Sequence, residues 1–202
     1  MKNLFIVLLA ILSLGASAQG FQGGISGGLN AARIDGDGHE IYGKLGLNLG
    51  AFASREIIRD QLYWQMEIKY TSRGKYQGPT RNFFGIEIID LRYVELPLSI
   101  QYLYNDKLQF EIGISPDVLL AEYYADENGA ISPEFANDLD RFGVTAFAGI
   151  NYFVLSKLAV GMRFNYSIIP FYKFDAYAIR YRDSGYFHDV LSLNARYYFS
   201  RN

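Results

Sequence analysis

Apolar and polar residues alternate one by one along much of this chain, and this period constrains the fold more than any other feature. Residues 62–70 read Leu-Tyr-Trp-Gln-Met-Glu-Ile-Lys-Tyr, with Leu, Trp, Met, Ile and Tyr at every second position. Segments 158–168 and 191–199 repeat the pattern. Because successive side chains of a β-strand point to opposite faces, the period predicts strands with one apolar and one polar face.

Weaker alternation in five further segments brings the number of predicted strands to eight. In chain order, the strands are expected at 21–32, 42–53, 62–70, 92–104, 108–115, 142–153, 158–168 and 191–199. Most of them approach roughly 9–11 residues, the length of a tilted transmembrane strand.

The connections between these strands are alternately long and short. Short links are expected at 54–61, 105–107 and 155–157, and longer ones near 35–40 and at 72–90, 121–141 and 171–189. All the long links then fall at one end of the sheet, as the external loops of an outer-membrane barrel do. The predicted fold class is all-β, an eight-stranded antiparallel up-and-down transmembrane β-barrel.

A soluble barrel of the lipocalin type shows the same alternation with its apolar face turned inward. Two features favour the membrane arrangement. The polar face is rich in small and uncharged residues, as a tightly filled interior would be. The apolar face is nearly free of charge, and it carries aromatic residues expected to form a membrane-interface girdle: Trp64, Tyr70, Tyr102, Tyr104, Tyr152, Tyr166, Tyr197 and Phe199.

The polar face also carries charges of both signs, which would lie inside the barrel. The predicted lumen charge network consists of Lys44, Glu67, Lys69, Glu95, Glu111, Arg163 and Arg196. An eight-stranded barrel is only wide enough for side chains to fill its interior, and buried charges need partners. We therefore expect a filled lumen and no general diffusion pore.

The N-terminus predicts export. Lys2 precedes an apolar run from Leu4 to Leu14, and Ala16-Ser17-Ala18 has the small-residue spacing that a signal peptidase cleaves. The run is shorter than the roughly 20 residues of a membrane-spanning helix. We expect a cleaved signal peptide at 1–18, a barrel domain at 19–202, and a location in the outer membrane of a Gram-negative bacterium.

The overall composition narrows the possible partners. The net charge is −2 with no basic stripe, which argues against nucleic acid, and the chain has no cysteine. The expected partners are outer-membrane lipid and other envelope proteins that meet the external loops. No cofactor or metal site is predicted.

The most distinctive local string is Tyr93-Val94-Glu95-Leu96-Pro97-Leu98, whose proline is expected to mark a bulge. This string, the glycine-rich first strand with Asn30, the stretch 113–120 and the aromatic end at 197–199 resemble the PorT-like outer-membrane β-barrel family of Bacteroidota. The resemblance implies the same barrel, with no catalytic residue to carry over. It also implies a possible role as an accessory of a protein-secretion machine.

Catalysis is a second alternative, since some outer-membrane barrels are enzymes. The two histidines, His39 and His188, are both expected in loops, and Ser184, His188 and Asp189 could be drawn as a hydrolase triad. Proximity in a loop does not establish that geometry, so no catalytic residue is predicted. The leading hypothesis is a non-enzymatic barrel whose long loops bind a partner or dock in an assembly.

Overall fold

The computed structural model describes residues 20–37, 41–79, 85–131, 139–174 and 185–200. Its strands, in chain order, are β1 (Phe21–Asp35), β2 (Lys44–Ile58), β3 (Leu62–Gln77), β4 (Glu87–Glu95), β5 (Leu98–Leu103), β6 (Leu108–Asp126), β7 (Gly129–Ala130), β8 (Phe142–Leu155), β9 (Leu158–Ser167), β10 (Tyr172–Lys173) and β11 (Gly185–Tyr198). No helix among these residues is long and apolar enough to cross a bilayer.

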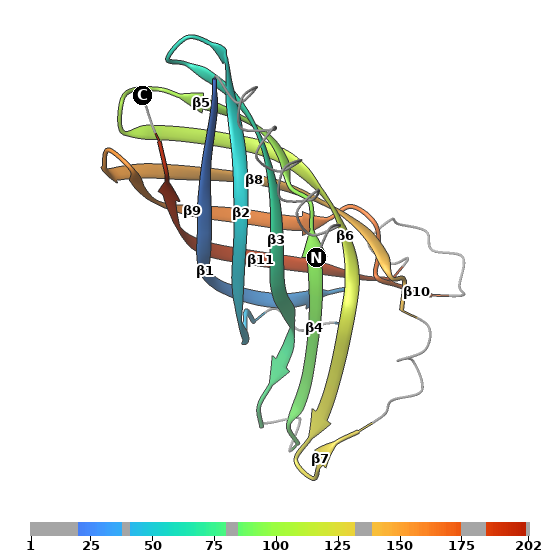
Figure 1. The fold of residues 1–202 in the computed structure, drawn as a ribbon. Helices are drawn as coiled ribbons and strands as arrows, with labels where there is room; N and C mark the ends of the chain where they lie inside the picture. The colour runs from blue at the N-terminus through green and yellow to red at the C-terminus, as the bar shows by residue number, and fades with distance from the viewer. Residues whose placement is uncertain (1–19, 38–40, 80–84, 132–138, 175–184, 201–202) are drawn as a thin grey trace, which may run out of the picture.

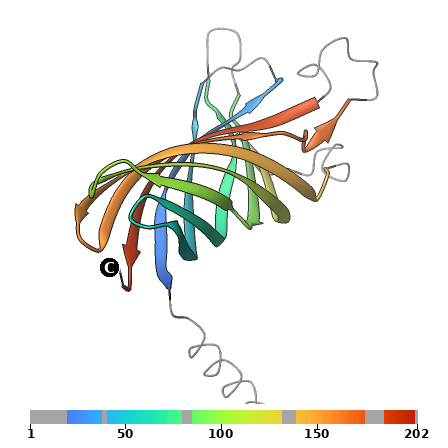
Figure 2. The same ribbon diagram turned by 90° about the horizontal axis from the view of Figure 1, so that it is seen from above.

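The strands form one closed antiparallel wall. Each long strand pairs with its neighbours in the chain, with β4 and β5 together filling one place between β3 and β6. The ring closes where β1 pairs with β11 from Gly24↔Tyr198 to Asp35↔Phe187, and Figures 1 and 2 show the strands curving around a common interior. The predicted fold class, an antiparallel barrel of eight ringed strands, is confirmed.

The two faces of the wall have opposite character. Outward side chains such as Leu47, Ile112 and Leu193 are more than 60% exposed, whereas the inward Glu67 and Arg163 are 2% exposed. A soluble barrel would place these groups the other way round, because exposed apolar surface in water is unfavourable. The apolar side therefore faces outward, as the membrane alternative requires.

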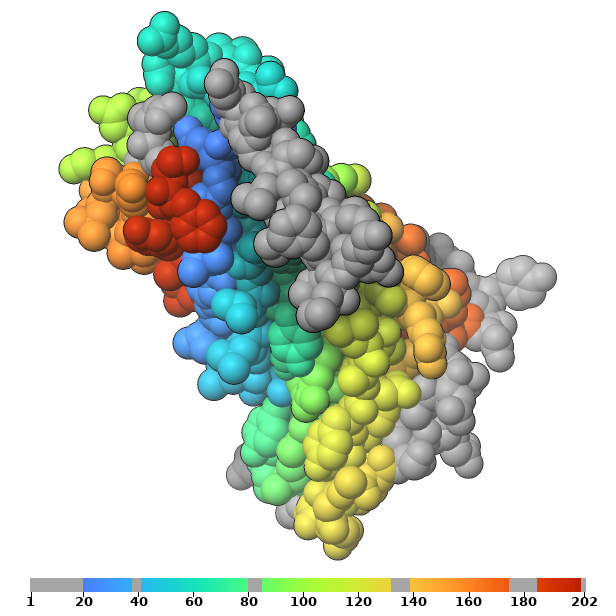
Figure 3. Space-filling model, in the orientation of Figure 1, coloured from blue at the N-terminus to red at the C-terminus, as the bar shows by residue number. Residues whose placement is uncertain are grey.

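The two ends of the barrel differ. We call one the short-turn end, where β2–β3, β5–β6 and β8–β9 are joined by brief turns, and the other the long-loop end. At the long-loop end, the β3–β4 and β6–β7 segments reach beyond the rest of the wall (Figure 3).

Several strands are longer than the alternation predicted. β3 runs to Gln77, β4 begins at Glu87, β6 runs to Asp126 and β11 begins at Gly185. Much of the predicted loops 72–90, 121–141 and 171–189 is therefore strand, which corrects that prediction. We call the part of the wall that faces the hydrocarbon of the membrane the apolar belt. Beyond this belt, the outward residues need not be apolar, so the alternation of apolar and polar residues fades although the strands remain paired.

The fourth predicted strand, 92–104, is interrupted at Pro97 and forms β4 and β5. Proline has no N–H to give to a strand ladder. The neighbouring backbone groups are nevertheless paired, because Leu96 N donates to Pro116 O at 2.9 Å and Glu67 N donates to Pro97 O at 2.9 Å. The register of β3 is the same before and after the break, with Lys69↔Glu95 and Met66↔Leu98, so the bulge expected at Pro97 is not present and the wall stays closed.

Candidate functional site

The lumen is filled by three layers of side chains. The layer at the short-turn end is apolar and aromatic. Its buried members are Phe52, Leu103, Phe153, Ala159 and Tyr198. The Tyr198 ring lies 4.9 Å from that of Phe52 and 5.4 Å from that of Phe153, measured between centroids. Nearby, a void of about 10 Å³ remains, room for roughly one water molecule.

The middle layer is a network of ion pairs centred on Glu111 of β6. Its carboxylate accepts from Arg163 Nε of β9 at 2.9 Å and lies 2.9 Å from Arg196 Nη1 of β11. Arg163 also reaches Glu67 of β3 at 3.4 Å, and Ser26 of β1 donates to Glu67. Side chains from five strands thus meet on the barrel axis.

The network continues toward the long-loop end. Glu95 of β4 binds Lys69 at 2.9 Å and Arg73 at 3.2 Å, and Arg73 binds Asp117 of β6 at 2.9 Å. Across the whole network, four cationic side chains face four carboxylates, so their formal charges cancel. Buried ions tolerate loss of water only when they are paired in this way.

The guanidinium groups also lie over aromatic rings. Arg73 Cζ is 3.9 Å from the centroid of Tyr93, and Arg163 Cζ is 4.3 Å from the centroid of Phe147. The ring of Phe147 occupies the space that a side chain at Gly113 would take, since a Cβ there would lie 2.6 Å from it. Cation–π contacts add attraction that helps to hold both arginines in place.

The structure brings together six of the seven residues predicted for the lumen network: Glu67, Lys69, Glu95, Glu111, Arg163 and Arg196. Lys44 is the seventh predicted residue, and its assignment to the lumen network was wrong. As the first residue of β2 it lies at the long-loop end, where its Nζ is 3.0 Å from Asp90 Oδ1. Sequence reasoning missed Arg73 and Asp117, because the predicted strands stopped at residues 70 and 115. Both residues continue the polar alternation of their strands, and that signal could have found them.

The third layer, at the long-loop end, is again apolar and aromatic. Its buried members are Ile34, Ile89, Leu91, Tyr93, Tyr124 and Phe171. His188 belongs to this layer, because its Nε2 lies 3.0 Å from Tyr93 Oη and its ring stacks 4.2 Å from that of Phe171.

The environment of His188 corrects the expectation of a loop histidine. It lies on β11 and is 1% exposed. Asp189 points to the other side of the wall, where it binds Arg33 at 2.8 Å and Tyr42 at 2.6 Å. His39 and Ser184 lie outside the described residues. A triad of Ser184, His188 and Asp189 is unsupported, because neighbouring strand residues face opposite ways.

Charged groups on the outer face mark where the apolar belt ends. Besides the Arg33–Asp189 pair, Asp90 lies 3.0 Å from Lys44 and 2.9 Å from Arg92. Burial by itself raises the pKa of Asp90, but hydrogen bonds from Ser72, Lys44 and Arg92 outweigh it and hold the pKa below its ordinary value. Residues beyond these pairs lie outside the belt.

The eight predicted girdle residues all lie on outward positions. Six of them lie toward the short-turn end: Trp64, Tyr102, Tyr104, Tyr152, Tyr197 and Phe199. Tyr70 lies midway along β3, away from either end. Tyr166 lies at the long-loop end, where its hydroxyl donates to Asp35 at 2.8 Å.

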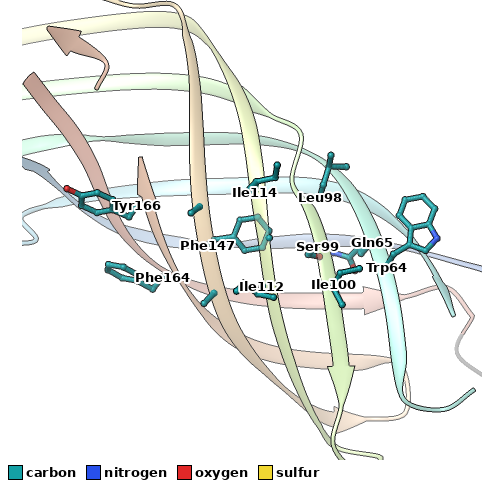
Figure 4. Close-up of a pocket in the computed structure, with 13 residues that line it drawn as sticks. Trp64, Gln65, Leu98, Ser99, Ile100, Ile112, Ile114, Phe147, Phe164 and Tyr166 are labelled. Atoms are coloured by element: carbon teal, nitrogen blue, oxygen red, sulfur yellow. The ribbon is translucent and has the colours of Figure 1, made fainter. Parts of the chain in front are cut away.

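The outer wall also contains an apolar hollow of about 780 Å³, shown in Figure 4. Trp64 and Tyr166 flank it, and Ala146 and Ala148 leave the space between larger neighbours. Its other apolar residues include Leu98, Ile112 and Phe164 (Figure 4). Because the hollow lies within the apolar belt, it faces the acyl chains of the membrane, and we assign no other ligand to it.

Comparison with known proteins agrees with this architecture. The family model described as an outer membrane protein beta-barrel domain matches residues 4–199. A search among curated proteins found no significant match.

Solved outer-membrane barrels have the same fold. The attachment invasion locus protein Ail of Yersinia pestis, solved with the heparin analogue sucrose octasulfate, has a TM-score of 0.51 and 13% identity, covering 89% of this chain and 99% of that one. Neisserial surface protein A has a TM-score of 0.52 and 11% identity, covering 87% of this chain and 96% of that one. At these identities the likeness concerns the fold alone.

Proposed function

The chain belongs to the outer-membrane β-barrel domain family and is an integral outer-membrane protein, and from this premise we propose that it is a closed, non-enzymatic barrel that acts through its long-loop end. The observation that carries the proposal is the filled lumen. A neutral ion-pair network lies between two aromatic layers, and both layers are built from buried side chains. A solute would have to break buried ion pairs to pass.

A conductance measurement tests the closed barrel. The purified protein, reconstituted in a planar lipid bilayer in concentrated KCl, should give no stable current steps, whereas a general porin measured in parallel should give them. Stable steps whose frequency rises with the amount of this protein would contradict the proposal.

The orientation supports a role outside the cell. Barrels of this kind have short periplasmic turns and longer external loops, so the long-loop end is assigned to the outside. There it would bind a partner or serve as a docking element in an assembly. Shortening the β6–β7 segment and the 78–86 connection should then abolish a partner interaction while leaving the barrel folded. Retention of every interaction by the shortened protein would count against this role.

Export supports the same location. We propose that residues 1–18 are a signal peptide and that the mature chain begins at Gln19, on the strength of the apolar run and the Ala16-Ser17-Ala18 site. N-terminal sequencing of the protein from outer membranes should therefore begin at Gln19. A chain that still begins at Met1 there would exclude the cleavage.

A second candidate function is that of an accessory of protein secretion, as the resemblance to the PorT-like family of Bacteroidota suggests. The support is the string Tyr93, Glu95, Pro97 and Leu98, of which the first two lie in the lumen beside Arg73. Co-purification from native membranes followed by mass spectrometry would test it. Secretion components should be recovered, and their absence would count against this alternative.

The other alternative, a barrel hydrolase, receives no support from the geometry. His188 is enclosed between Tyr93 and Phe171, and Asp189 lies on the other face of the wall. In the part of the chain that the structure describes, no group of three or more His, Cys, Asp or Glu side chains could hold a metal ion.

A further inference from the structure

Positive charge gathers on the outer wall where the apolar belt ends toward the long-loop end. Strands β3 and β4 lie side by side there (Figure 1), with Tyr70 opposite Val94 and Ser72 opposite Arg92. From Tyr70 and Val94 toward the short-turn end, the outward residues of this part of the wall are apolar or aromatic. Arg92 is therefore the first charged side chain on this face, at the level where hydrocarbon gives way to lipid headgroups.

Two cations share one carboxylate at this level. Asp90 Oδ1 lies 3.0 Å from Lys44 Nζ, and Asp90 Oδ2 accepts from Arg92 Nε at 2.9 Å. These three side chains, which we call the belt-edge cluster, therefore carry one formal positive charge. Arg92 presents that charge to the outside, because 47% of its side chain is exposed, against 17% for Lys44 and 11% for Asp90.

The hydrogen-bond donors of Arg92 are only partly used. Asp90 accepts from Nε, and among the described residues no acceptor bonds to either Nη atom. The N–H groups of the two Nη atoms therefore remain for a ligand. In a planar guanidinium they form a fork that matches two oxygens of a phosphate.

The surroundings of the cluster select a ligand with two different parts. The exposed fork needs an anionic group with several oxygens, and the apolar wall next to it contacts only hydrocarbon. A membrane lipid with a phosphate in its headgroup has both parts at this spacing, since its phosphate lies at the edge of the hydrocarbon region. Basic residues at this depth attract anionic headgroups over the distance of the Debye length.

We propose that the belt-edge cluster binds the phosphate of a membrane lipid, with the phosphate oxygens on the two Nη atoms of Arg92 and the acyl chains along β3 and β4. Lys44 adds a second positive charge from the other side of Asp90. Asp90 positions the guanidinium through Nε and, being negative, limits the affinity for the phosphate. The proposal rests on the proposed function only for the leaflet, which is the outer one if the long-loop end lies outside the cell.

Three lipids with the same acyl chains provide the test: dioleoyl phosphatidic acid, dioleoylglycerol hemisuccinate and dioleoylglycerol. Native mass spectrometry of the protein in maltoside micelles gives the apparent dissociation constant of the first bound lipid. Phosphatidic acid should bind at least about fivefold more tightly than dioleoylglycerol, with the carboxylate lipid between them. Millimolar inorganic phosphate should not displace it, since the acyl chains contribute to binding. Equal binding of all three lipids, tightest binding of the hemisuccinate, or displacement by inorganic phosphate would overturn the proposal.

Two substitutions should move the affinity in opposite directions. Arg92→Gln should weaken phosphatidic acid binding about fivefold and leave dioleoylglycerol binding unchanged, whereas Asp90→Asn removes the competing carboxylate and should strengthen phosphatidic acid binding. Arg59→Gln is the matched control, because it removes the same charge from a side chain that is 92% exposed in the β2–β3 turn at the other end of the barrel. It should not change the binding of any of the lipids.

Heat-dependent gel migration checks that each variant is folded. If Arg92→Gln is not, Arg92→Lys replaces it; this variant keeps the charge without the fork and should lose the preference for phosphatidic acid over the hemisuccinate. A purely structural role for the cluster would make both substitutions weaken binding, and an equal loss for Arg59→Gln would show attraction by net charge alone. Either result would contradict the proposed site.

The lipid titration does not depend on whether the barrel conducts ions or on its direction in the membrane. Absence of phosphate selectivity would therefore leave the closed barrel untouched. Conduction by the barrel, or the opposite orientation, would leave the lipid site untouched.

Discussion

Glu111 is the residue on which the middle of the barrel depends, since Arg163 and Arg196 both end on its carboxylate. Glu111→Gln would leave two buried guanidinium groups short of negative charge. Breaking a buried ion pair costs about 3–5 kcal/mol, because the remaining charge stays desolvated. We therefore expect urea unfolding in lipid vesicles to show a loss of this size for Glu111→Gln.

Glu56→Gln is the matched control for this experiment. Glu56 is exposed near the short-turn end of β2, and substitution of an exposed residue usually changes stability by no more than about 0.5 kcal/mol. Equal stability of the Glu111 and Glu56 variants would show that the lumen network does not stabilise the barrel.

Asp90 makes a second, pH-dependent contribution on the outer face. Its pKa is held below the ordinary value by Ser72, Lys44 and Arg92 after burial is overcome. A lowered pKa in the folded state gives stability that is present above the unfolded value, about 3.9, and lost as the pH falls below it.

Asp90→Asn should therefore lower the free energy of unfolding at pH 7 by about 1 kcal/mol, as expected for a partly exposed ion pair. The difference from the parent should shrink as the pH falls from 5 to 2, and acid-range unfolding curves would measure it. A difference that stays constant over this range would show that the ionised carboxylate is not the source.

At the residue scale, alternation assigned to the inward face the six charged residues that the structure brings together in one network. The prediction failed for Lys44, because the side chain of a strand's first residue need not point to the face that the alternation predicts. It missed Arg73 because the next outward residues after Tyr70 are Ser72 and Gly74, which are not apolar. It missed Asp117 because the predicted strand ended before Pro116, although the outward residues Val118 and Leu120 are still apolar. The pairing partners themselves were not predictable, since Glu111 and Arg196 are 85 residues apart.

At the scale of the strand, Gly113 shows how β6 accommodates its neighbours. A Cβ at this position would lie 2.2 Å from Leu98 O and 2.6 Å from the Phe147 ring, which itself carries Arg163. Gly113→Ala should therefore displace Phe147 or the β5 backbone, at a cost of about 1–3 kcal/mol for overpacking. Urea unfolding of the reconstituted barrel would measure the loss.

Gly27→Ala is the corresponding control in β1. A Cβ there meets only Leu49 Cδ1 at 3.5 Å, an ordinary contact. Because alanine costs less conformational entropy than glycine in a strand, this variant should be neutral or slightly more stable. A loss for Gly27→Ala as large as that for Gly113→Ala would argue against close approach as the cause.

Strand existence was more predictable than strand length. Inside the membrane the outward residues must be apolar, so the period is strict and the eight strands are readable from it. Outside the membrane that requirement disappears. The segments 72–77 and 87–91 therefore look like loop in the sequence, although they pair as strands from Ser72↔Arg92 to Gln77↔Glu87.

At the scale of the whole molecule, the fold class followed from alternation and from the long and short connections. The cavity of about 230 Å³ at the long-loop end did not, because the residues that line it are distant in the chain: Ile34, Asp37, Lys75, Glu87, Ile89, Tyr124, Phe171, Tyr172, Phe174 and Tyr186. Only closure of the ring brings them together. The alternation in a sequence indicates which face of the sheet a residue occupies. It does not indicate which distant residues lie at the same level along the barrel axis.

A closed barrel can cross the membrane in either of two directions, and the chain's lack of cysteine makes the direction measurable with single introduced cysteines. Asn128 lies in the β6–β7 turn at the long-loop end, and Asp106 lies in the β5–β6 turn at the short-turn end. A large maleimide that cannot cross the outer membrane should label Asn128→Cys on intact cells. It should label Asp106→Cys only after the membrane is permeabilised.

Labelling both variants in detergent gives the control, since both turns are then accessible and should react equally. Labelling of Asp106→Cys alone on intact cells would reverse the orientation. The long-loop end would then open to the periplasm, and any partner that it binds would have to come from there. Orientation thus decides from which side of the outer membrane the long-loop end meets its ligand.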